Sequence, residues 1–126
     1  PAAAAPLSSA LARCRSGSEI AEAVQRWRNR DRRSKTLRDC TDGIAALGRW
    51  SLWAKSLSLL READEERFGR SGPDIVTLGA AITACARGQQ WSRALVLLDS
   101  LPARGLERNV VTVNAAINVR PAHVGS

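Results

Sequence analysis

Apolar residues recur along most of the chain at the spacing of one face of an α-helix. In the first such stretch Ile20, Ala23, Val24 and Trp27 fall at positions i, i+3, i+4 and i+7, with charged residues between them. An apolar stripe at this spacing is the pattern of an amphipathic helix that packs on a core. The same periodicity predicts six helices in all, over residues 16–33, 35–47, 51–68, 74–88, 91–101 and 109–119. The chain is therefore expected to be all-α.

Polar residues at the predicted helix starts, and glycine or proline at the ends, support these limits. Ser16 and Glu19 have the spacing of a capping box, in which each side chain satisfies an unpaired amide near the helix start. Asp74 precedes the fourth helix as an N-cap, and Gly88 stops that helix. Pro102 ends the fifth helix because it has no amide hydrogen to donate.

The helical pattern is repeated along the chain. Residues 74–78 (Asp-Ile-Val-Thr-Leu) return as residues 109–113 (Asn-Val-Val-Thr-Val), an interval of 35 residues. Residues 53–60 align with residues 91–98 at an interval of 38, and the three extra residues fall in the acidic stretch 62–68, which reads as an insertion. A fixed period of this length, with two short helices in each unit, is the signature of a solenoid of helical hairpins.

The predicted fold is therefore a short α-solenoid of antiparallel helical hairpins. One good repeat covers residues 75–109 and a degenerate repeat covers about 37–74, within a repeat domain over 19–118. Residues 1–18 are rich in Ala, Ser and Arg without any acid, which is typical of a flexible leader or of the remnant of an organellar transit segment. Residues 119–126 are expected to form a C-terminal tail.

The net charge favours an anionic partner. Nineteen Lys and Arg residues against twelve Asp and Glu give +7, although solubility and a compositional bias toward Arg would also explain this value. Seven basic residues gather in one short segment, where they would neutralise phosphates without reading sequence. The alternative is a solvated helix end with its arginines in water. These candidate contact residues are Arg26, Arg28, Arg30, Arg32, Arg33, Lys35 and Arg38.

Candidate catalytic chemistry is missing from the sequence. The three cysteines lie far apart, so they predict neither a disulfide framework nor a zinc site. His123 is the only histidine, and no glycine-rich phosphate loop is present. The longest apolar stretch, residues 75–86, is too short to span a membrane. We expect a protein that is not an enzyme, has no metal or other cofactor and does not span a membrane.

The good repeat resembles a known family. The residues Val76-Thr77, Ala81-Ile82, Ala84-Cys85-Ala86-Arg87-Gly88, Trp91, Ala94-Leu95, Leu97-Leu98, Gly105-Leu106 and Asn109-Val110-Val111-Thr112 carry the resemblance to the pentatricopeptide repeat family. The resemblance is specific over residues 73–118 and weaker over 37–72. It implies an organellar protein, of mitochondrion or plastid, whose stacked hairpins hold single-stranded RNA with one base read per repeat. The fifth and last residues of a repeat read the base, and an apolar second residue packs against it.

The resemblance implies an incomplete set of RNA-binding residues. The good repeat has Val76 at the second position, Gly79 at the fifth and Asn109 at the last. Val76 and Asn109 fit the pattern, but Gly79 has no side chain that could contact a base. Asn109 also suits a helix N-cap.

The neighbouring repeats supply the remaining candidates. The following half repeat has Val111 and Asn114 in the corresponding places. The degenerate repeat has Thr41 and Asp74 as its reading pair, with Arg38 where an apolar residue is expected. At most one or two nucleotides could be read, at about 1–3 kcal/mol for each base contact, which is too little for sequence-specific binding.

Two functions are compatible with these features. The small number of repeats and the incomplete reading set favour a structural adaptor that docks as an accessory subunit on a large organellar assembly, such as a ribosome or a photosynthetic or respiratory complex. The alternative is a module that binds organellar single-stranded RNA for its processing or stabilisation, which the family resemblance and the arginine-rich segment favour. Either protein would be soluble or peripherally attached in its organelle.

Overall fold

The computed structural model describes residues 5–66, 72–107 and 109, and this part of the chain is all-α. The helices are α1 (Leu7–Ala12), α2 (Gly17–Arg28), α3 (Leu37–Arg49), α4 (Trp53–Glu66), α5 (Ile75–Arg87) and α6 (Trp91–Asp99), with two single-turn 3₁₀ helices at Arg32–Ser34 and Pro102–Arg104. The described residues form no strand, so the predicted all-α class is confirmed for them. The helix predicted over 109–119 lies outside the described residues, apart from Asn109.

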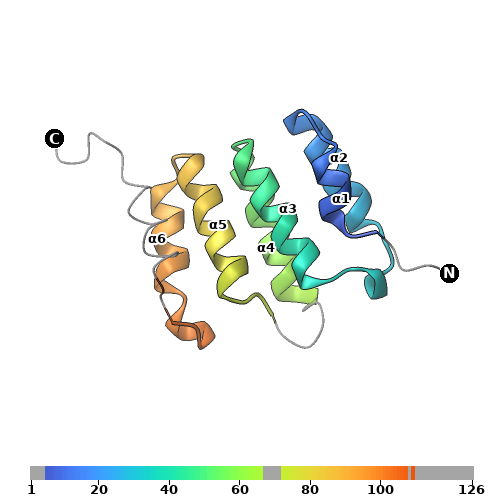
Figure 1. Ribbon diagram of the computed structural model, residues 1–126. Coiled ribbons are helices and arrows are strands. Elements are labelled where there is room, and N and C mark those ends of the chain that lie inside the picture. The colour runs from blue at the N-terminus through green and yellow to red at the C-terminus, as the bar shows by residue number, and fades with distance from the viewer. Residues whose placement is uncertain (1–4, 67–71, 108, 110–126) are drawn as a thin grey trace.

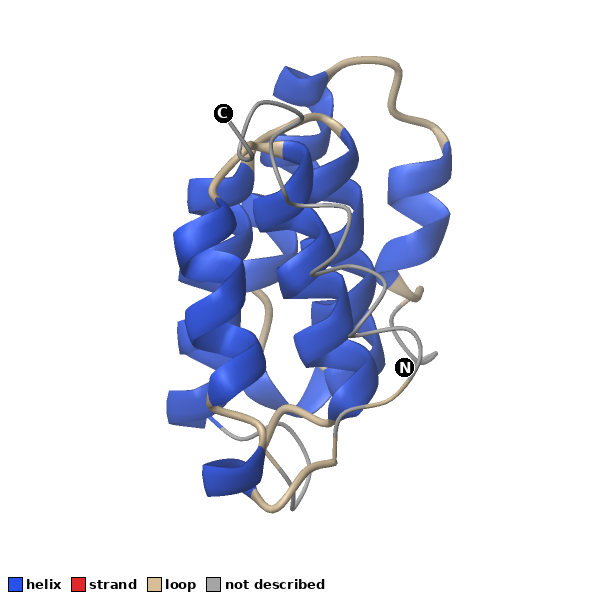
Figure 2. Cartoon of the chain, turned by 90° about the vertical axis from the view of Figure 1, so that its left-hand side faces the viewer, coloured by secondary structure: helices blue, strands red, loops and turns tan. Residues whose placement is uncertain are grey.

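Consecutive helices pack in pairs, and the pairs meet mainly through their first helices. α3 packs against α4 and α5 packs against α6, while α3 also contacts both α1 and α5. Figure 1 shows α1, α3 and α5 following one another across the molecule in chain order, and Figure 2 shows the same helices from the α6 end. The α3–α5 contact is the most extensive one between elements of the described chain.

The helices of the two hairpins α3–α4 and α5–α6 begin at equivalent places, 38 residues apart. Thr36 caps α3 by accepting a hydrogen bond from the amide of Asp39, and Asp74 caps α5 in the same way from the amide of Thr77. Trp53 and Trp91 begin the second helix of each hairpin. The interval of 38 residues found in the sequence is thus also the interval between equivalent helix starts.

The turns inside these two hairpins are also equivalent. Ser51 and Gln89 both adopt the left-handed backbone conformation, with φ of 60° and 58°. In each turn the next amide returns to a carbonyl of the preceding helix, from Leu52 to Leu47 at 2.9 Å and from Gln90 to Cys85 at 2.8 Å. This closing bond is the one that defines a Schellman motif, which satisfies carbonyls at a helix end. A left-handed conformation at a non-glycine residue costs free energy, so both turns carry some strain.

Close contact between α3 and α5 depends on a small residue. A Cβ atom placed on Gly48 would lie 2.7 Å from the Cβ and 2.9 Å from the Cα of Ala84. Around this contact Ile44, Leu47 and Ile82 are completely buried. Glycine at position 48 therefore lets the two helix backbones approach and sets the spacing of the two hairpins.

Helix α1 corrects the prediction of a flexible leader over residues 1–18. Its residues Leu7 and Leu11 are buried, and α1 packs on α2 and α3. The buried carboxylate of Asp39 in α3 accepts a hydrogen bond from the amide of Leu7 at 3.0 Å and another from the indole of Trp27 at 3.2 Å. Asp39 thus connects α1, α2 and α3, and α1 supplies the first helix that pairs with α2.

The capping box differs in one detail, and the acidic stretch is part of a helix. The carboxylate of Glu19 accepts its hydrogen bond from the amide of Arg15 rather than Ser16, although the Ser16 hydroxyl caps the amide of Glu19 as expected. The acidic residues up to Glu66 form the last turns of α4, within the helix predicted over 51–68, and α4 is longer than the equivalent helix α6. Glu62 and Asp64 in those turns form ion pairs with distant arginines, which sequence spacing does not reveal.

Candidate functional site

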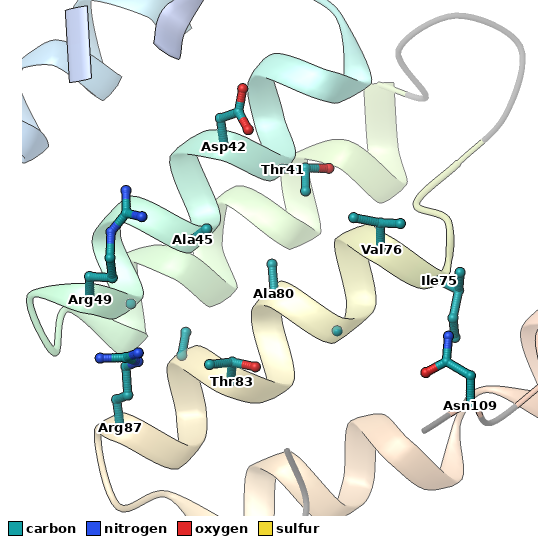
Figure 3. Close-up of a pocket in the computed structure, with 13 residues that line it drawn as sticks. Thr41, Asp42, Ala45, Arg49, Ile75, Val76, Ala80, Thr83, Arg87 and Asn109 are labelled. Carbon is teal, nitrogen blue, oxygen red and sulfur yellow. The ribbon is translucent and has the colours of Figure 1, made fainter. Parts of the chain in front are cut away.

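The candidate site is a groove of about 520 Å³ between α3 and α5, on the face where the two hairpins meet. Figure 3 shows its lining side chains, which come from both helices and from Asn109. The groove exists because the residues between the two helices are small: Gly48 and Ala45 on α3, and Gly79 and Ala80 on α5. Glycine and alanine fill little of the space above the helix contact.

The two ends of the groove differ in character. Arg49 and Arg87, the last residues of α3 and α5, lie at one end, as Figure 3 shows. They stand 38 residues apart at the same place in successive hairpins, and both are exposed. Toward the other end lie Thr41 and Val76. Val76 is apolar and yet 64% exposed. The groove thus offers an apolar contact at one end and two guanidinium groups at the other.

A chain of hydroxyl groups connects the two helices beside the groove. The hydroxyl oxygens of Thr41 and Thr77 are 2.8 Å apart, and the Thr77 hydroxyl lies 2.8 Å from Oδ1 of Asp74. Thr41 Oγ1 also lies 3.0 Å from the carbonyl oxygen of Leu37. The Thr77 hydroxyl donates to Asp74, and the Thr41 hydroxyl has one proton for two acceptors, the Thr77 oxygen and the Leu37 carbonyl. Thr41 and Asp74 are thereby held in one hydrogen-bonded unit.

The structure brings together most of the residues predicted to bind RNA. Thr41, Val76, Gly79 and Asn109 all line the groove, and Asp74 joins them through Thr77. Gly79 is buried and forms part of the groove floor, consistent with its lack of a side chain that could contact a base. Val111 and Asn114 lie outside the described residues.

The seven basic residues predicted to contact an anionic partner do not act as one surface. Arg28 forms an ion pair with Glu62 of α4 at 2.6 Å. Lys35 is buried, donates to the carbonyl of Arg28 at 3.0 Å, lies over the ring of Trp27 and is 3.7 Å from the Glu66 carboxylate. For Lys35 the prediction of an exposed anionic contact is therefore wrong, because its ammonium group closes the link between α2 and α4.

The remaining members of this set are exposed or half-buried. Arg32 donates to the backbone carbonyl of Glu66, and Arg38 lies 3.9 Å from Asp42 with its own side chain 87% exposed. Arg30 donates to the carbonyl of Ala5 at 2.8 Å. Arg26 and Arg33 are exposed. Three of the seven, Arg28, Lys35 and Arg38, thus have a carboxylate partner within the described chain.

Sequence reasoning missed three residues of the groove region. Arg49 and Arg87 were not singled out, although they end the two equivalent helices at the interval of 38 that the tryptophans define. That equivalence is the signal that could have found them. Thr77 was known only as a repeated residue, and its role as the link between Thr41 and Asp74 depends on a contact across 36 residues.

The buried cysteines are protected rather than reactive. Burial raises the pKa of the Cys40 thiol from 9.0 to about 12, and burial raises that of Cys85 to about 11. Cys40 donates to the carbonyl of Leu59 at 3.6 Å. Because the thiolate is the nucleophilic form, neither side chain is suited to covalent catalysis near neutral pH.

Comparisons with known proteins add no family to this geometry. No protein-family model matches the chain, and no curated protein is similar to it in sequence. Within residues 5–66 and 72–107, no helix has the length and apolar character needed to cross a membrane. The same part of the chain holds no group of three or more His, Cys, Asp or Glu side chains placed to bind a metal ion.

Proposed function

We propose that this chain is a short α-solenoid of the pentatricopeptide repeat type whose α3–α5 groove binds single-stranded RNA in an organelle. The observation that supports this most directly is the meeting of Thr41 and Asp74, through Thr77, beside the exposed Val76. The family resemblance assigns Thr41 and Asp74 to the reading of one base, and Val76 to the packing of the base of the following repeat. Thr41 lies on α3 and Asp74 caps α5, so the meeting of this reading pair depends on the packing of the two hairpins.

The two ends of the groove suit the two parts of a nucleotide, its base and its phosphate. A base packs against the exposed side chain of Val76. The edge of the base donates a hydrogen bond to Oδ2 of Asp74, which accepts none within the described chain. The phosphates pass toward Arg49 and Arg87, since guanidinium groups bind phosphate oxygens in a two-pronged geometry. One read base gives weak selectivity, so affinity comes mainly from phosphate contacts.

The test is fluorescence anisotropy with a labelled single-stranded RNA over a range of salt concentrations. The variant carrying both Arg49→Ala and Arg87→Ala is expected to bind more weakly and to reduce the slope of log affinity against log salt by about 1.4, because each lost phosphate contact on a single strand removes about 0.7. The matched control is Arg61→Ala, which removes an exposed arginine from α4, outside the groove. Equal losses in the control and in the double variant would mean that the groove does not hold RNA.

A second candidate function, docking on a large organellar assembly, is favoured by α6. Trp91, Leu95 and Val96 on this helix are 43%, 38% and 67% exposed, and contiguous apolar surface of this kind is typical of protein interfaces. A pull-down from isolated organelles, with and without ribonuclease, separates the two functions. A protein complex that stays bound after digestion would support the adaptor, whereas loss of all bound material would support RNA binding.

A further inference from the structure

A second cleft, of about 440 Å³, lies at the other end of the molecule between α1 and α2. Arg13, at the end of α1, stands on one wall, and Arg26 and Arg30 stand on the other. The only acidic side chain in its lining is that of Glu19, near the start of α2. Trp27 also borders the cleft and is almost fully buried, so the base of the cleft is rigid.

Some basic residues of the described chain are balanced by a carboxylate, and the three cleft arginines are not. Arg28, Lys35 and Arg104 each face a carboxylate of α4, at 2.6, 3.7 and 2.7 Å respectively. By contrast, none of the three cleft arginines forms an ion pair within the described chain.

The hydrogen bonds of the cleft arginines leave most of their donors available. Arg30 donates one Nη1 hydrogen bond to Ala5, and Arg13 uses only Nε, at 3.5 Å from the carbonyl of Ser9. The Arg26 side chain makes no hydrogen bond within the described residues. Since each guanidinium group carries five N–H donors, the cleft presents many unused donors.

The arrangement is unfavourable without a counter-charge. Arg26 and Arg30 are four residues apart, where like charges on a helical turn repel each other, and Arg13 brings a third positive charge to the same space. An anion between the walls would relieve this repulsion and use the free guanidinium donors. Three positive charges and the single negative charge of Glu19 leave a net charge of about +2. This charge balances the charge of about −2 on a phosphate monoester near neutral pH.

We propose that the α1–α2 cleft binds a phosphate monoester group, held between Arg13 on one wall and Arg26 and Arg30 on the other. The volume of the cleft is in the range of small-molecule sites, so it has room for a nucleoside attached to the phosphate. Such a group is found on a free nucleotide and on the 5′ end of an RNA. The site is separate from the α3–α5 groove and does not depend on the function proposed for that groove.

Isothermal titration with the full chain tests the site, using inorganic phosphate, adenosine monophosphate and one short RNA with either a 5′-phosphate or a 5′-hydroxyl. We expect the monophosphate to bind, and Arg13→Gln and Arg26→Gln each to weaken it by roughly tenfold, because each removes charge-assisted hydrogen bonds. Arg61→Gln, with the same loss of charge on α4, should leave the affinity unchanged. Glu19→Gln should strengthen binding by a few fold, because the amide keeps an acceptor for Arg15 but removes the negative charge.

The two RNAs distinguish the sources of the phosphate. Tighter binding of the 5′-phosphate RNA than of the 5′-hydroxyl RNA identifies an RNA end as the ligand. Equal binding of the two RNAs, together with binding of adenosine monophosphate, identifies a free nucleotide. Either result supports the cleft as a monoester site, provided that the effect is weakened in Arg26→Gln and not in Arg61→Gln. Three results would overturn the proposal: no heat of binding at millimolar phosphate and monophosphate, equal loss in Arg61→Gln and Arg26→Gln, or a phosphopeptide that binds more tightly than every nucleotide probe.

Discussion

Replacement of Asp39 by alanine should destabilise the protein more than any other single change of a charged residue in α3. The carboxylate is 4% exposed and accepts hydrogen bonds from the Leu7 amide and the Trp27 indole. A hydrogen bond to a charged group contributes about 1.5–3 kcal/mol, so the loss of both amounts to about 3–6 kcal/mol. Removal of a buried charge returns part of this, because the charge no longer has to be desolvated. We therefore expect Asp39→Ala to lower the free energy of unfolding by about 2–4 kcal/mol.

Two further variants make the reasoning specific. Asn at position 39 has the shape of Asp but only one oxygen, so it can satisfy one of the two donors, and Asp39→Asn should fall between alanine and the natural protein. Asp42→Ala is the matched control, because Asp42 lies on the same helix and only meets the exposed Arg38 at 3.9 Å. A surface pair of this kind contributes less than about 1 kcal/mol.

The assay is urea unfolding followed by far-ultraviolet circular dichroism and by tryptophan fluorescence. A double-mutant cycle with Trp27→Phe measures the coupling of Asp39 to the indole, since the phenyl ring keeps the packing but has no N–H. If Asp39→Ala and Asp42→Ala change the free energy of unfolding equally, or if the cycle gives no coupling, Asp39 does not connect the three helices as described.

Three other perturbations test the packing. Iodoacetamide should alkylate the half-buried Cys14 much faster than Cys40 or Cys85, and all three alike in urea. Burial raises the pKa of Cys40 from 9.0 to about 12 and that of Cys85 to about 11, so the unfolded chain loses these protons first, and stability should decline as the pH rises from 9. Equal alkylation rates in the folded protein would contradict the assigned burial. Ser51→Gly should stabilise by about 0.5–1 kcal/mol, since glycine tolerates the φ of 60°, and a lower Tm would speak against this turn. Gly48→Ala should cost about 1–2 kcal/mol despite the better helix propensity of alanine, because its methyl group would press on Ala84; a gain in stability would show that α3 and α5 are not so close.

The sequence predicted α5 within one residue at each end, because Asp74 and Gly88 mark it on both sides. It did not predict α1, because six residues are less than two turns and do not establish a helical period. It extended the first predicted helix to residue 33, whereas α2 ends at Arg28. Lys35 turns back to the carbonyl of Arg28, and this contact across seven residues is not encoded in a helical period.

The candidate site was predicted in part. Thr41, Val76 and Asn109, which repeat alignment selected as candidates for RNA binding, line one groove, and their binding of RNA stays a prediction. The arginine-rich segment was treated as one surface because a sequence shows charge density but not which charges have partners. Arg28 differs from Arg26 because it pairs with the carboxylate of Glu62 on α4, more than thirty residues away, which only the fold brings close.

The link from Thr41 through Thr77 to Asp74 has a consequence for any attempt to change what the groove recognises. Asp74 is the N-cap of α5, since its Oδ1 accepts from both the amide and the hydroxyl of Thr77. The same residue is the candidate reading residue of the preceding hairpin. A substitution chosen only for a new base preference would also remove a cap that contributes about 1 kcal/mol. Redesign at this position is therefore restricted to Asn, Ser and Thr, the side chains that still begin a helix, and the α5 cap limits the set of bases that this repeat could be made to read.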